Sequence, residues 1–87
     1  MKIKDGFMLR KLGVQNVVVA VGKASRDFNG IIRLNDTGKF LWEKLANDMT
    51  EEQLAAALLA EYDIDEAGAR SDISEFIAKL RKAELLA

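Results

Sequence analysis

Hydrophobic and polar positions in the first third of the chain alternate over short runs that turn-forming residues separate. The run Phe7–Leu12 predicts a first strand, although its alternation is imperfect. The run Val17–Val21 is mostly β-branched, which favours a strand over a helix. Because the four residues between the two runs, Gly13–Asn16, include turn formers, we expect the strands to form an antiparallel hairpin.

A polar stretch, Gly22–Asn29, leads to a third strand at Gly30–Leu34. We expect the polar stretch to be a loop, in which Phe28 either covers the edge of the sheet or belongs to a short extra strand. In that second arrangement, the turn-forming pair Asn29 and Gly30 closes a local hairpin.

The third strand separates two faces of the predicted sheet. A period of two places Ile32 and Leu34 on one face, and Ile31 and Arg33 on the other. Leu34 leads directly into the first predicted helix, which must cover one face of the sheet. We therefore expect Ile32 and Leu34 to point toward the core.

From residue 35 onward, the apolar residues recur at the spacing of helices. Asn35 or Asp36 is expected to cap a first helix that runs to about Asn47. Its apolar positions follow the i, i+3, i+4, i+7 pattern, namely Gly38, Leu41, Trp42 and Leu45. A glycine weakens a helix, so Gly38 indicates a close approach of the helix backbone to the sheet. The indole of Trp42 is expected in the core.

Two further helices follow the first. Thr50 and Gln53 have the spacing of a capping box and begin the second helix, whose predicted apolar face is Ala55, Leu58, Leu59 and Tyr62. Asp65 caps a third helix over about residues 66–82, whose predicted buried residues are Ala69, Ile73, Phe76, Ile77 and Leu80. The tail at Leu85 and Leu86 is expected to fold back on the core or the sheet.

Three strands followed by three helices indicate an α+β fold, in which the helices cover one face of a three-stranded antiparallel sheet. The 87 residues are enough for a single domain, residues 1–87, with one modest core. No apolar run is long enough to cross a membrane, and the first residues lack the apolar core of a signal peptide. We therefore expect a cytoplasmic protein with no membrane partner.

The chain offers little for catalysis or metal binding. It has no Cys and no His, which removes thiolate chemistry and the commonest general base and metal ligand. Its serines have no evident base to activate them, and the acidic pairs stand at helix starts, where carboxylates favour the positive end of the helix dipole. We expect no enzyme activity, no cofactor and no metal site.

Charge is divided unevenly along the chain. Residues 1–44 contain nine Lys and Arg against four Asp and Glu, whereas residues 45–87 contain four against ten. A basic sheet half and an acidic helix half would steer an acidic partner toward the sheet. The alternative is a surface on which both signs are well mixed.

Three functions are compatible with these elements. In a winged-helix DNA-binding regulator the third helix would read the DNA, but residues 65–82 carry equal numbers of both charges, whereas phosphate binding favours a basic face. In a peptide-binding domain, the third strand would accept an extended segment beside it. The third alternative is an accessory subunit without a groove. We favour peptide binding, with no nucleic-acid partner.

The order of several motifs resembles the PqqD family of pyrroloquinoline quinone (PQQ) biosynthesis. The first motif is Leu34, Asn35, Thr37, Gly38, Leu41 and Trp42. The second is Thr50–Leu54 with Leu58, and the third is Glu61–Asp65 followed by Asp72, Ile73, Phe76, Ile77 and Leu80. The match covers roughly residues 5–86. It departs from the family at Ala83–Leu85, where members usually carry Gly before the final Leu.

The resemblance implies a winged-helix-like fold and a peptide chaperone, also called a RiPP recognition element. Such a domain holds the leader segment of a ribosomally synthesised precursor peptide and presents it to a modifying enzyme, typically a radical SAM enzyme. The pathway can be that of PQQ or of another such peptide. The leader is expected to add as a strand beside the third strand and against the third helix.

Carried onto this chain, the resemblance implies the following peptide-binding residues: Ile31, Ile32, Arg33, Leu34, Arg70, Ile73 and Ile77. The alternative for Ile32, Leu34, Ile73 and Ile77 is a pure core role. Arg33 and Arg70, together with the basic sheet half, favour a leader that carries acidic residues among its apolar anchors. An exposed strand edge can also pair with a second copy, so a homodimer stays open.

Overall fold

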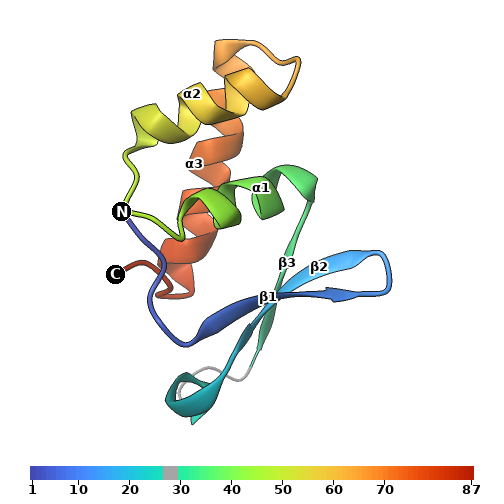
Figure 1. Ribbon diagram of the computed structural model, residues 1–87, viewed down its shortest axis with the longest axis vertical. Coiled ribbons are helices and arrows are strands. Elements are labelled where there is room, and N and C mark those ends of the chain that lie inside the picture. Colours follow the sequence, from blue (N-terminus) through green and yellow to red (C-terminus); the bar gives the residue numbers. More distant parts are fainter. Residues whose placement is uncertain (27–29) are drawn as a thin grey trace.

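The computed structural model describes residues 1–26 and 30–87 and confirms the predicted α+β fold (Figure 1). A three-stranded antiparallel sheet precedes three helices, and a short 3-10 helix, η1 (Gly22–Arg26), lies between the second and third strands. The main elements are β1 (Phe7–Leu12), β2 (Gln15–Ala20), β3 (Ile31–Leu34), α1 (Asp36–Lys44), α2 (Glu51–Glu61) and α3 (Glu66–Lys82).

The hairpin of β1 and β2 forms as predicted, but β2 begins two residues earlier than the β-branched run. Gln15 pairs with Leu12 and Asn16 pairs with Lys11, so the ladder continues almost to the turn. Gly13 there has a φ of 61°, a left-handed conformation that glycine adopts without strain. The hairpin tip projects beyond the helices in Figure 1.

The segment between β2 and β3 differs from the predicted loop. Its first five residues form η1, in which the Ser25 hydroxyl donates a hydrogen bond to the Gly22 carbonyl at 2.7 Å. The two arrangements considered for Phe28, and the turn at Asn29, lie outside the described residues.

The predicted faces of β3 are confirmed. Leu34 is buried in the core, and Ile32 is partly buried and packs against it. Ile31 is 49% exposed and Arg33 is exposed, so both point to the opposite face. The inner face of the sheet, which also contributes Val18 to the core, is therefore the face that the helices cover.

Helix α1 begins directly after β3, because Asn35 caps it. The Asn35 side chain accepts a hydrogen bond from the Gly38 backbone N–H at 2.7 Å. A Cβ at Gly38 would lie 3.2 Å from Cβ of Leu34, which confirms the predicted close approach to the sheet. Trp42 is buried as predicted, but the helix ends at Lys44 rather than Asn47.

Helix α2 begins with the predicted capping box between Thr50 and Gln53, and both of its hydrogen bonds are present. Its predicted apolar face is wrong at Leu59, which is 37% exposed. The buried residues are Leu54, Ala55 and Leu58. Because successive helical residues are about 100° apart, a face centred on Leu54 and Leu58 turns Leu59 toward solvent.

Helix α3 buries all five predicted residues. Its end forms a Schellman motif, in which the Leu85 N–H donates to the Leu80 carbonyl at 2.9 Å and the Glu84 N–H to that of Arg81 at 3.0 Å. Glu84 adopts a φ of 59°, where glycine is the usual residue. This is the segment in which the sequence departs from the family pattern.

The tail folds back as predicted and joins the two ends of the chain. Leu85 is fully buried, and Leu86 forms a β-bridge with Ile3. The Met1 ammonium contacts the Asp48 carboxylate at 2.7 Å, and that hydrogen bond lowers the pKa of Asp48. The two termini consequently lie near each other (Figure 1).

Candidate functional site

Strand β3 forms one margin of the sheet, because the strand order is β1-β2-β3. The Arg33 carbonyl accepts a hydrogen bond from the Lys79 ammonium on α3 at 3.3 Å. In an antiparallel strand the N–H and C=O of one residue point to the same side, and alternate residues repeat the direction. The backbone groups of Arg33 and Ile31 therefore face the margin. Within residues 1–26 and 30–87, no further strand pairs there.

A hollow of ≈ 50 Å³ lies beside this margin, between the junction of β3 with α1 and one side of α3. Its walls come from the end of β3, the first turn of α1 and a row along α3. The lining residues are Leu34, Asn35, Thr37, Gly38, Asp72, Glu75, Phe76 and Lys79. Phe76 is only 5% exposed, so it forms an apolar floor that is continuous with the core. We call the margin and the hollow together the β3–α3 cleft.

The β3–α3 cleft carries opposite charges at its two ends. Lys79 reaches Arg33 at one end. Asp72 and Glu75, one to two helical turns earlier on α3, line the hollow near the start of α1. An extended segment in the cleft would therefore meet the Lys79 ammonium at one end and carboxylates at the other.

The structure brings some of the predicted binding residues to the cleft and places others elsewhere. Ile31, Ile32, Arg33 and Leu34 form the β3 margin itself. Ile73 and Ile77 are buried in the core, at 2% and 3% exposure. Neither isoleucine is among the residues that line the hollow.

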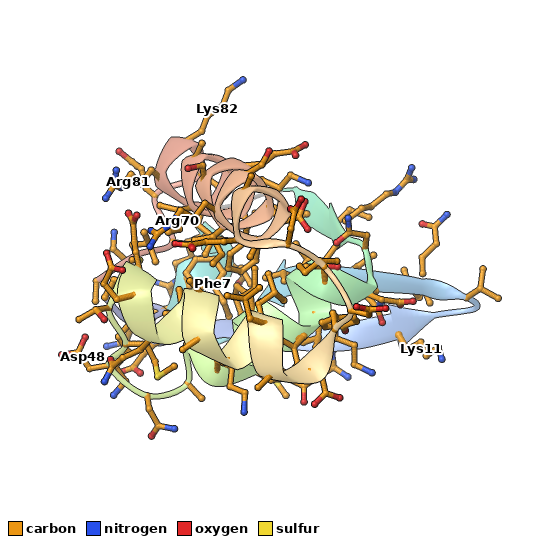
Figure 2. The ribbon with its side chains drawn as sticks, turned by 90° about the horizontal axis from the view of Figure 1, so that it is seen from above. Phe7, Lys11, Asp48, Arg70, Arg81 and Lys82 are labelled. Carbon is orange, nitrogen blue, oxygen red and sulfur yellow. The ribbon has the colours of Figure 1, made fainter. Side chains whose placement is uncertain are left out.

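Arg70 lies on the other side of α3, toward α2 (Figure 2). Its guanidinium donates to the Glu52 carboxylate at 3.2 Å and to the Glu66 carboxylate at 3.1 Å. The hydrogen bond to Glu52, followed by that to Glu66, raises the pKa of Arg70. Its charge is therefore already met by two carboxylates of its own chain.

Helix geometry explains the separation of Arg70 from Lys79. The two residues are nine positions apart, or two and a half turns, so they project from opposite sides of α3. Four residues of the β3-facing side were not predicted as binding residues from the sequence, namely Asp72, Glu75, Phe76 and Lys79. Their spacing of three, one and three marks them as one side of a helix. It does not say which neighbour that side faces.

Two other hollows lie away from the β3 margin. One of ≈ 550 Å³ is open between the N-terminal segment, β1 and α1, and its lining includes Ile3, Phe7 and Trp42. The other, of ≈ 110 Å³, lies between α2 and α3 beside Arg70 and Ile73.

The described residues hold no cluster of three or more His, Cys, Asp or Glu side chains arranged to bind a metal ion. Over the same residues, no helix combines the length and the apolarity needed to cross a membrane. The arrangement of the cleft instead suits main-chain hydrogen bonding along β3, with apolar and charged contacts from α3.

Comparison with solved structures gives two close matches in fold. The structure described as "TbiB1 in Complex with the TbiA(beta) Leader Peptide" superposes with a TM-score of 0.75 at 24% identity, over 99% of this chain and 94% of that one. The structure described as "Lasso peptide synthetase B1 complexed with the leader peptide" gives a TM-score of 0.70 at 18% identity, over 93% and 89%. A search of curated protein sequences found no match.

Comparison with family models identifies one family. The model described as "Coenzyme PQQ synthesis protein D (PqqD)" matches residues 15–86. The matched region begins at the first residue of β2 and includes η1, β3 and all three helices. The chain therefore belongs to the PqqD family.

Proposed function

We propose that this domain is a non-catalytic recognition element, which binds the leader segment of a ribosomally synthesised precursor peptide and presents it to a modifying enzyme. The observation that carries the proposal is the β3–α3 cleft, an open strand margin beside a hollow that has Leu34 and Phe76 among its otherwise polar lining. Membership of the PqqD family supports it, and both similar structures are described as leader-peptide complexes.

In the proposed complex, the leader adds to the sheet as a fourth strand beside β3. Its main chain bonds to the outward N–H and C=O groups of Ile31 and Arg33, which is the usual source of affinity in strand addition. Its inward side chains lie over Leu34 and Phe76. Ile32, Ile73 and Ile77 support this surface from the core side, whereas a direct part for Arg70 stays a prediction.

Lys79 has to move when such a strand binds. In the free domain its ammonium occupies the Arg33 carbonyl, the acceptor that a leader N–H would use. The displaced ammonium remains at the margin, where it can pair with a carboxylate of the leader. Asp72 and Glu75 repel a carboxylate at the other end, so the position of an acidic leader residue matters.

The modifying enzyme in this proposal is a radical SAM enzyme of the cytoplasm, acting in PQQ or related peptide biosynthesis. A homodimer through the β3 margin would use the groups that the leader needs, so the two states would compete. The DNA-binding alternative is not favoured, because the exposed side of α3 beside β3 carries Asp72 and Glu75.

The test is a titration of ¹⁵N-labelled protein with the leader of a ribosomally synthesised precursor peptide from the same organism. We expect the largest amide shifts in residues 30–34 and 72–79. A shuffled peptide of the same composition is the control. Shifts confined to the hollow near Trp42, or no shifts with any leader, would contradict the proposed binding mode.

A further inference from the structure

Exposed apolar side chains gather on the sheet, on the face that the helices leave uncovered. The outer face consists of the residues whose side chains alternate with the core-facing ones, namely Met8, Arg10, Leu12, Gln15, Val17, Val19, Ile31 and Arg33. Met8 is 45% exposed, Leu12 59% and Ile31 49%. Val14, at the hairpin tip, adds a side chain that is 92% exposed.

The pairing register makes this face continuous across the three strands. Met8 pairs with Val19, which pairs with Ile31, and Arg10 pairs with Val17, which pairs with Arg33. Paired residues in a sheet share a face, so the face is a row of apolar residues beside a row with an arginine at each end.

The second row has a fully buried centre, since Val17 is 0% exposed although it lies outside the core cluster of the inner face. Long arginine side chains lay their aliphatic stems over apolar neighbours and keep the charged group in water. Arg10 and Arg33 pair with Val17 from the two sides and are exposed, and the Arg10 guanidinium lies 4.0 Å from the Met8 sulfur.

The face is cationic as well as apolar. Of the cations in the three strands, Arg10 and Arg33 lie on this face, and the strands contain no Asp or Glu. Exposed apolar residues beside cationic ones are typical of a surface that binds a negatively charged partner.

We propose that the outer face of the sheet docks an acidic surface of the modifying enzyme, an inference that rests on the proposed function. A second copy is a poor occupant, because a two-fold contact would set the cationic face against itself. The enzyme that receives the leader is a better candidate, because the leader would lie beside this face. A leader strand beside β3 would place alternate side chains level with Ile31 and Arg33 and so extend the outer face with the leader itself.

The enzyme would then contact the domain and its bound leader on one continuous surface. In protein interfaces, arginines and large aromatic side chains near the centre carry most of the binding energy. Arg10 meets that description here, and the exposed Leu12 adds apolar area beside it. Both lie on β1, away from the β3–α3 cleft.

The experiment measures enzyme binding and leader binding separately on the full chain. The probe is a radical SAM enzyme that modifies the precursor peptide in the same organism, immobilised for surface plasmon resonance. The variants are Arg10→Glu and Leu12→Ser. Lys82→Glu is the matched charge-reversal control, because that lysine is exposed and points away from the sheet (Figure 2).

We expect each outer-face variant to weaken enzyme binding by about tenfold or more, the range of a central interface residue. The leader affinity of both variants should stay within about twofold of wild type, because neither substitution touches the cleft. Lys82→Glu should have only a small effect on enzyme binding, because charges outside the centre of an interface contribute little. Raising the salt concentration should weaken the binding of wild type more than that of Arg10→Glu.

Equal enzyme binding by wild type and both outer-face variants overturns the inference, as does failure of the wild type to bind the enzyme. Binding to anionic phospholipid vesicles that needs Arg10 and Leu12, without binding to the enzyme, would assign the face to a membrane and also overturn it. If the domain binds the enzyme but not the leader, the proposed function is wrong and the inference about the outer face is unaffected.

Discussion

The two long sides of α3 carry cations in opposite situations. Toward α2, Arg70 is held by the carboxylates of Glu52 and Glu66. Toward β3, Lys79 contacts the backbone carbonyl of Arg33. The first side is closed by charges of the same chain, whereas the contact on the second side is one that an added strand can replace.

This difference shows which charged group is free to select a ligand. Releasing Arg70 would leave two carboxylates unpaired, which opposes its use by another molecule. Releasing Lys79 leaves a carbonyl that an incoming N–H satisfies at once. The presence of an exposed cation on a helix therefore does not by itself show which side of the helix binds a ligand. The partner of each cation is the better guide.

The largest effect is expected from the apolar floor of the β3-facing side. Phe76→Ala should lower the free energy of unfolding by about 3–5 kcal/mol, because it removes a buried ring and leaves a cavity. Urea denaturation followed by circular dichroism measures the change. Glu75→Ala, one residue earlier and exposed, is the control and should change stability by less than about 0.5 kcal/mol. Similar losses of unfolding free energy in both variants would show that the Phe76 ring does not form the apolar floor of this side.

The next effect concerns the β3 margin itself. Arg33→Pro removes an N–H that faces the margin, where proline is tolerated in an edge strand, so the fold should persist. Leader affinity should fall about tenfold, or ~1.4 kcal/mol, because one main-chain hydrogen bond to the leader is lost and the adjacent one is distorted.

Arg33→Ala keeps that N–H and is the control, measured by the same isothermal titration. If alanine weakens leader binding as much as proline does, the side chain and not the backbone provides the affinity. If neither does, the leader binds away from β3.

A third prediction concerns the backbone conformation at the end of α3, which should affect stability but not leader binding. Glu84→Gly should raise the free energy of unfolding by about 1 kcal/mol, because glycine adopts the left-handed conformation of this residue without strain. Leader affinity should not change. Thermal unfolding checks the stability, and Glu84→Ala should give no such gain, since it removes the charge and keeps the strained φ.

The smallest effect compares the two cations directly. Lys79→Gln should reduce the preference for a leader with Glu over the same leader with Gln by roughly threefold to tenfold, as for one partly exposed charge pair. Arg70→Gln should leave that preference within about twofold, because the Arg70 guanidinium is directed toward α2. Fluorescence anisotropy with both leaders measures the ratios. A larger change in Arg70→Gln would restore Arg70 as the selecting residue.

Local sequence patterns predicted the elements well because their causes are local. The Asn35, Thr50 and Asp65 caps each satisfy a backbone N–H three residues away. The burial of Gly38 beside Leu34 follows from a strand that turns directly into a helix. The exposure of Leu59 was not predictable in the same way, because Ala-rich α2 offers apolar residues on more than one side.

The candidate site was predicted in part. Both the margin at Ile31–Leu34 and the apolar stripe of α3 follow from periodicity, and the structure places them as expected. Arg70 was assigned to the cleft because the resemblance to the PqqD family implied it. The structure instead shows that its turn of the helix faces α2.

The sequence by itself determined which residues of α3 are apolar, where each helix begins, and which face of β3 is inward, because these depend on contacts within a few residues. Only the tertiary structure decided which border of the apolar stripe lies beside α2 and which beside β3. A stripe has two polar borders of similar composition. The rotation of the helix about its axis is fixed by packing against α1, α2 and the sheet together, so it cannot be obtained from spacing along one segment.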